Sequence, residues 1–113
     1  MRERGRAAED LAATFLQQQG LTLVERNYHC RFGEIDLIAR ENATLVFVEV
    51  RMRSGAAFGA AAASITAAKR DKLLRTARHY LAGLARTPAC RFDAVLIGGD
   101  ERPPEWLKNA FGE

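Results

Sequence analysis

Hydrophobic residues recur along this chain with two different periods, and the change of period separates the expected helices from the expected strands. Within residues 3–19 they are three and four positions apart, at Ala8, Leu11, Ala12, Phe15 and Leu16. This spacing places them on one face of a helix, which predicts an amphipathic helix packed against the rest of the fold. Gly20 stands where a left-handed helix end is expected.

Three runs rich in β-branched and aromatic residues follow this helix and predict strands at 21–27, 33–40 and 44–53. The tripeptide Glu41-Asn42-Ala43 separates the last two runs and is typical of a short hairpin turn. The three strands are therefore expected to form a meander. Residues 54–63, which are rich in glycine and alanine, predict a loop after it.

The second half of the chain returns to the helical period and then to the strand period. A helix is expected from Ser64 or Thr66, either of which can cap it, to about residue 84. A fourth strand is expected over 91–97, and residues 104–111 are expected to form a short terminal helix or an extended tail.

A helix between the third and fourth strands suggests a sheet in which not all neighbours are antiparallel. The order of elements therefore predicts an α/β fold, a mixed β-sheet flanked by helices. The chain has 113 residues, of which 48% are hydrophobic and 27% charged, which is typical of one packed globular unit. Residues 1–113 are expected to form a single domain.

Two carboxylates interrupt the apolar pattern of the second and third strands. Asp36 lies between Ile35 and Leu37, and strict alternation places Ile35, Leu37 and Ala39 on the opposite face from Asp36. In the third strand, Glu49 follows the apolar residues of its own face. Burying a carboxylate costs roughly several kcal/mol unless a positive charge compensates it, and two carboxylates on adjacent strands also repel each other.

Two arrangements would stabilise this acid pair, and the spacing leaves both open. A divalent cation, Mg²⁺ or Mn²⁺, could be held by Asp36, Glu49 and the backbone carbonyl of Val50, with waters and a substrate phosphate as further ligands. The cation could then activate a water for hydrolysis, and Arg51 could contact the phosphate. In the alternative, the carboxylates form structural salt bridges with nearby arginines, namely Arg31, Arg51 or Arg53.

Two further charged residues border the expected apolar faces of the helices. Glu9 lies at the edge of the first helix's apolar face, where it either points toward the sheet or is solvated. Lys69 belongs to the row Ile65, Lys69 and Leu73, whose spacing faces inward, so its ammonium group either extends to water or reaches into a site. The same helix carries a basic flank suited to phosphates or simply to solvent, formed by Arg70, Arg75 and Arg78.

The charge balance gives mild support to an anionic partner. The net charge is +3, and lysine occurs only at 69, 72 and 108, so arginine dominates. Arginine forks match phosphates, although an arginine- and alanine-rich composition also follows from a GC-rich genome. No apolar run approaches the roughly 18 residues of a membrane span, and the N-terminal residues do not resemble a secretory signal. We therefore expect a cytoplasmic location and no membrane partner.

Six segments together resemble the bacterial YraN/UPF0102 family, and they cover essentially the whole chain. They are Gly5-Arg-Ala-Ala-Glu-Asp, Gly33-Glu-Ile-Asp-Leu-Ile-Ala, Val46-Phe-Val-Glu-Val-Arg, Ser64-Ile-Thr-Ala-Ala-Lys, Arg91-Phe-Asp-Ala-Val and Asn109-Ala-Phe. That family is similar to the PD-(D/E)XK nucleases, especially the archaeal Holliday-junction resolvases. The resemblance therefore implies a restriction-endonuclease-like core.

The resemblance also implies roles for individual residues. Asp36 and Glu49 match the two strand acids of the superfamily, and Glu9 matches the first-helix glutamate of resolvase-like members. Arg51 stands where the superfamily has a lysine; arginine can stabilise charge on a phosphate, but it does not readily lose a proton to act as a base. Lys69 is the candidate that could supply the missing ammonium group from the following helix.

Asp93 belongs to the resemblance as well, without a catalytic role, and is expected to anchor the sheet edge by hydrogen bonds. Resolvase-like relatives usually work as dimers, which leaves a homodimer open. Phe58 and Trp106 are aromatic candidates for such an interface or, equally, for covering the core.

These observations lead to one main functional hypothesis and two alternatives. The main hypothesis is a metal-dependent endonuclease that hydrolyses DNA phosphodiester bonds, including those of branched or structured DNA. The substitution at Arg51 keeps open a nucleic-acid-binding protein with a nuclease fold and little or no cleavage activity. A protein with no nucleic-acid role is the third hypothesis, but it would gain nothing from two acids that repel each other.

Overall fold

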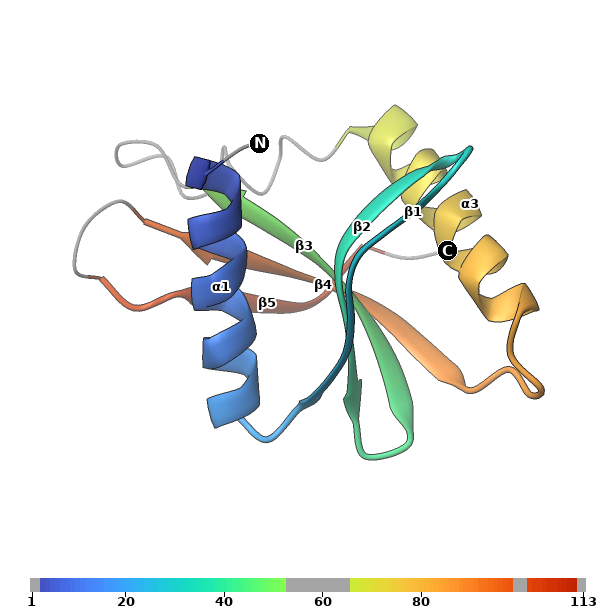
Figure 1. Ribbon diagram of the computed structural model, residues 1–113, viewed down its shortest axis with the longest axis horizontal. Helices are drawn as coiled ribbons and strands as arrows, with labels where there is room; N and C mark the ends of the chain where they lie inside the picture. The colour runs from blue at the N-terminus through green and yellow to red at the C-terminus, as the bar shows by residue number, and fades with distance from the viewer. Residues whose placement is uncertain (1–2, 53–65, 99–101, 112–113) are drawn as a thin grey trace.

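The computed structural model describes residues 3–52, 66–98 and 102–111, which form two helices and five strands (Figure 1). In chain order these are α1 (Glu3–Gln18), β1 (Thr22–Cys30), β2 (Gly33–Glu41), β3 (Thr44–Met52), α3 (Ala67–Ala82), β4 (Ala89–Ile97) and β5 (Glu105–Phe111). Predicted loop residues 54–63, together with Phe58 and Arg53, lie outside the described residues. Within the described ranges, no helix is long and apolar enough to cross a membrane.

The five strands form one sheet in the order β1-β2-β3-β4-β5. Neighbouring strands are antiparallel except β3 and β4, which run parallel because the chain passes through α3 between them. The predicted α/β fold with a mixed sheet flanked by helices is therefore confirmed. The turn at Asn42 closes the β2–β3 hairpin as expected, and this residue adopts the left-handed conformation with φ 55°.

The helices pack on opposite faces of the sheet, so each face contributes to its own core cluster (Figure 1). In β3, Val46 and Val48 pack with α1, whereas Leu45 and Phe47 pack with α3. The alternation predicted for this strand is thus correct. Ala8, Ala12 and Leu16 lie on the buried face of α1, as predicted. The assignment of Leu11 to this face is wrong, because Leu11 is 54% exposed.

The C-terminal segment is a strand, and the predicted alternative of a short helix is wrong. β5 pairs antiparallel with β4, and the pairing shifts between Phe92 and Ala94. At this shift the carboxylate of Asp93 takes the place of a ladder acceptor, because the Asn109 N–H donates to Asp93 Oδ1 at 2.9 Å. Asn109 has φ 56°, as a residue at such an irregularity often does.

Asp93 is fully buried, and its carboxylate is surrounded by donors. Arg91 Nε donates to Oδ1 at 3.0 Å, and Trp106 Nε1 donates to Oδ2 at 2.9 Å. Trp106 also packs edge-on against Phe15 of α1, with ring centroids 6.1 Å apart, so it covers the core. Asp93 therefore anchors β5 to the sheet, as expected.

Candidate active site

The β2–β3 ladder stops where the two predicted acids face each other. Its last registered pair is Leu37 with Val48, one step before Asp36 and Glu49. Asp36 turns its carboxylate into the opening, where Oδ2 accepts the Val50 N–H at 2.9 Å. Along a β-strand, the N–H and C=O of one residue point to the same side of the strand. The Val50 carbonyl oxygen therefore faces the same side as the Asp36 carboxylate.

The alternation of β2 is interrupted at Asp36, which corrects one expectation. Ile35 was expected to share a face with Leu37 and Ala39, but it packs in the cluster beneath α3, whereas those two pack with α1. Ile38 also packs beneath α3, so residues on both sides of Asp36 reach the same cluster. A strict two-residue period could not have indicated this break.

Glu49 is half-buried, and one of its carboxylate oxygens lacks the partner that a structural carboxylate requires. Its side chain is 17% exposed, and Oε1 has no hydrogen-bond partner among the described residues. Arg51 Nη2 lies 3.7 Å from Glu49 Oε2, which is an ion pair without a hydrogen bond. The Nε of Arg51 is itself buried and has no partner in the described part of the chain. Both groups therefore keep unused hydrogen-bonding capacity inside the protein.

Burial and mutual repulsion raise the pKa values of both acids. Desolvation is the main cause at Asp36; Glu9 and Glu34 raise its pKa further, while the Val50 N–H and Arg51 limit the rise to about 6. Desolvation again dominates at Glu49, and repulsion by Asp36 helps to raise its pKa to about 8 although Arg51 and Lys69 oppose this. Near neutral pH the pair therefore retains a proton, mainly on Glu49, that a nearby cation would displace.

Glu9 lies beside this pair but makes its closest contacts with β1. Its Oε1 accepts a hydrogen bond from Asn27 Nδ2 at 2.9 Å and lies 3.7 Å from Arg26 Nη2. The side chain is only 16% exposed, in agreement with a position facing the sheet. Glu9 acts on Asp36 electrostatically, since its charge raises the Asp36 pKa.

Lys69 is exposed, which fits the expected alternative in which its ammonium group extends to water. It stands in the first turn of α3, where its N–H donates to the capping Thr66 Oγ1 at 3.2 Å. Burial along α3 begins only at Leu73. The ammonium group nevertheless acts on the site, because its charge lowers the pKa of Glu49.

Glu34 is a residue that the sequence reasoning did not assign to the site. It is exposed at the start of β2, and its charge raises the pKa of both Asp36 and Glu49. Its position two residues before Asp36 in the same strand could have indicated that it belongs to the site.

No three acidic, histidine or cysteine side chains in the described ranges gather closely enough to hold a metal by themselves. A cation here would depend on two carboxylates, a backbone carbonyl and water.

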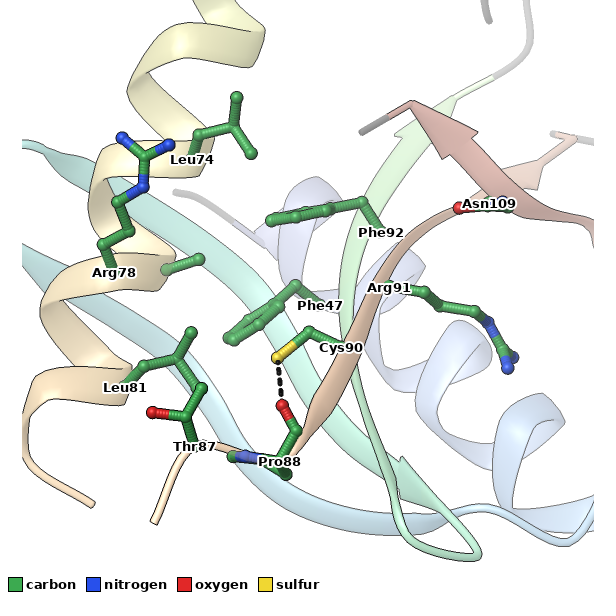
Figure 2. Close-up of a pocket in the computed structure, with 11 residues that line it drawn as sticks. Phe47, Leu74, Arg78, Leu81, Thr87, Pro88, Cys90, Arg91, Phe92 and Asn109 are labelled. Carbon is green, nitrogen blue, oxygen red and sulfur yellow. Dashed lines mark hydrogen bonds between the residues drawn. The ribbon is translucent and has the colours of Figure 1, made fainter. Parts of the chain in front are cut away.

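A separate hollow of about 390 Å³ opens between α3 and the first half of β4 (Figure 2). Figure 2 shows Phe47 and Phe92 directed toward the helix, with Leu74 and Arg78 across from them. None of the predicted site residues lines this hollow. The acid pair and the hollow are therefore distinct features of the molecule.

Comparisons with known proteins give one consistent family. Residues 8–97 match the model of the family described as "Uncharacterised protein family UPF0102". The chain is 67% identical over 111 residues to UPF0102 protein NE0719 of Nitrosomonas europaea, covering 97% of this chain and 94% of that protein. It is 57% identical over 112 residues to UPF0102 protein Nmul_A0195 of Nitrosospira multiformis, covering 98% and 94%. A similar protein in Psychromonas ingrahamii is 50% identical over 110 residues, with 97% and 90% covered.

Proposed function

The chain belongs to the UPF0102 family, and from that premise and its half-buried acid pair we propose that it is a metal-dependent endonuclease that hydrolyses DNA phosphodiester bonds. The observation that carries this proposal is the opening in the β2–β3 ladder, where Asp36 and Glu49 converge and Glu49 Oε1 has no partner among the described residues. The proposal includes a restriction-endonuclease-like core, which the mixed sheet with a helix on each face supports.

The donor atoms around this opening suit a hard divalent cation. Mg²⁺ prefers oxygen ligands and usually takes one or two carboxylates, completed by water and substrate phosphate. Asp36, Glu49 and the Val50 carbonyl would hold Mg²⁺ or Mn²⁺, and Glu9 would add negative charge from α1. When bound, such an ion neutralises charge on a phosphodiester and lowers the pKa of water.

Arg51 would contact the phosphate under attack. Its Nε is buried without a partner in the described residues, and its Nη2 stays beyond hydrogen-bond distance from Glu49. A guanidinium group with free donors can stabilise the charge that develops on phosphate oxygens. Because arginine stays protonated, it does not take a proton from water in this scheme. Lys69 would supply a second, mobile positive charge from the helix end.

A second candidate function follows from the same arginine. If the lysine that Arg51 replaces is needed for proton transfer, the chain would bind nucleic acid at this site with little or no cleavage. Binding would then weaken steeply with salt, because phosphate contacts release counterions.

A cleavage assay tests the proposal. Purified protein is incubated with duplex, single-stranded and four-way-junction DNA in Mg²⁺, Mn²⁺ or EDTA. We expect cleavage that requires metal and that falls to background in Asp36→Asn, while Asp10→Asn, an exposed acid of α1, stays active. We expect Arg51→Ala to lower the rate by roughly 10²-fold. Salt-sensitive binding without cleavage would favour the second candidate, and neither binding nor cleavage would contradict both.

A further inference from the structure

The hairpin between β1 and β2 ends in a turn whose residues are unusual for that position. Cys30 pairs with Gly33, which leaves Arg31 and Phe32 at the tip. Tight hairpin turns favour Asn, Asp and Gly, and the neighbouring hairpin follows this rule at Asn42. At the β1–β2 tip, the Arg31 guanidinium carbon instead lies 4.8 Å from the centre of the Phe32 ring. The tip therefore presents an exposed cation held over an aromatic ring.

This tip is fixed against α3 (Figure 1). A Cβ at Gly33 would lie 3.1 Å from Thr76 Oγ1, so the strand approaches the helix more closely than other residues allow. The Phe32 ring packs edge-on against His79, with centroids 6.0 Å apart. The Tyr28 hydroxyl hydrogen-bonds His79 Nδ1 at 2.5 Å. Arg31 is thus carried on a supported element rather than on a free loop.

The helix that supports the tip is strongly basic. Over its sixteen residues it carries five lysines and arginines and one acid, Asp71, which pairs with Arg75 at 3.1 Å. The basic side chains are all exposed: Lys69, Arg70, Lys72, Arg75 and Arg78. The Cβ of Lys72 would lie 3.8 Å from a Cβ at Gly33, so this lysine is next to the hairpin tip.

This basic surface leads to the acid pair. Lys69 acts on Glu49 electrostatically, and Glu34, which follows Gly33, acts on both acids. Gly33, the first residue of β2, is three residues before Asp36, which corresponds to about 10 Å along a strand, and Arg31 lies just beyond it in the turn. Nucleotides on one strand of duplex DNA are spaced about 3.4 Å along the axis, so the tip would reach about three to four base pairs from the acids.

We propose that the β1–β2 hairpin tip and α3, through Arg31 and Lys72, hold the phosphate backbone of DNA about three to four base pairs from the hydrolysed bond. This inference rests on the proposed function and assigns it a substrate-binding surface. A nucleic acid fits better than an apolar partner, because the large exposed hydrophobic residues of the described chain lie elsewhere. They are Leu11, Val24, Met52 and Leu84.

The test is DNA binding measured without metal, so that it does not depend on cleavage. Fluorescence anisotropy of a short labelled duplex is followed in EDTA from about 50 to 200 mM salt. The double variant Arg31→Ala/Lys72→Ala should lower the slope of log K against log salt by roughly two and weaken binding on the order of tenfold. Arg31→Lys/Lys72→Arg should bind like the unaltered protein, because the charges remain.

Lys108→Ala is the matched control, because Lys108 lies over Trp106, which packs on the α1 side of the sheet. It should change the slope by much less than one. Equal effects of the double variant and of this control would overturn the binding surface while leaving the proposed cleavage activity intact. If the unaltered protein binds no DNA at any salt concentration, both the surface and the proposed function are wrong. The tip variants should melt like the unaltered protein, since Arg31 and Lys72 are exposed.

Discussion

Two aspartates lie at interruptions of the ladder, Asp93 fully buried and Asp36 half-buried, and their partners distinguish their roles. Asp93 accepts the Asn109 N–H and is surrounded by donors from Arg91 and Trp106. Asp36 accepts the Val50 N–H, but the acid beside it, Glu49, keeps one oxygen without a partner in the described residues. A carboxylate whose oxygens all accept hydrogen bonds stabilises the fold. Two carboxylates that lack such partners repel each other, and a bound cation can reduce this repulsion.

The unsatisfied acid pair predicts that the stability of the protein depends on pH. Glu49→Gln should remove part of this pH dependence. The pKa of Glu49 is raised from its ordinary 4.5 to about 8, so the folded protein holds a proton that the unfolded chain releases. Metal-free stability should therefore fall as pH rises from about 4.5 to 8. At pH 8, Glu49→Gln should raise the free energy of unfolding by roughly 1–3 kcal/mol, with almost no change near pH 5.

Thermal unfolding in EDTA measures this effect, since about 1 kcal/mol moves the Tm of a domain of this size by roughly 4–8 °C. Glu25→Gln, at an exposed position of β1, should leave the Tm unchanged at either pH. If Glu49→Gln instead destabilises the protein at pH 8, then Glu49 and Arg51 form a structural salt bridge and the metal site is wrong.

At the scale of the elements, the sequence indicated the helices and strands whose positions depend on the local pattern of apolar residues. The sequence pattern located two helices and four strands: α1, β1, β2, β3, α3 and β4. The short turn at Asn42 set the register that brings Asp36 opposite Glu49. The sequence left the segment of β5 open between a short helix and an extended tail, because that strand is held by partners distant in sequence, through Asp93. It also placed Lys69 inward by spacing, although the first turn of α3 contributes no buried side chain.

The anchoring of β5 gives a prediction about stability. Asp93→Asn removes the charge that pairs with Arg91 and replaces one acceptor oxygen by an NH₂ group, which cannot accept the Trp106 N–H. It should therefore lower the free energy of unfolding by about 3–5 kcal/mol. Urea denaturation measures this loss. Asp71→Asn, which breaks an exposed ion pair on α3, should cost less than about 1 kcal/mol. Comparable losses in the two variants would mean that Asp93 does not anchor the strand.

At the scale of the whole molecule, the two faces of the sheet contribute opposite charges to the same opening. Glu9 acts on Asp36 from α1, and Lys69 acts on Glu49 from α3 on the other face. The sequence could indicate that these residues carry chemistry. It could not show that β2 and β3 separate at Asp36, because the separation depends on how Ile35 and Ile38 both reach the core beneath α3.

The most direct measurement is calorimetric binding of Mn²⁺ to the unaltered protein near pH 7.5, with a short duplex present and in buffers of different ionisation heat. We expect one ion per chain and release of protons on binding, because the ion displaces protons held by the acid pair. Asp36→Asn and Glu49→Gln should each weaken the affinity by at least roughly tenfold, while Asp10→Asn should not. An affinity that is unchanged in Asp36→Asn, or no binding at all, would contradict the account.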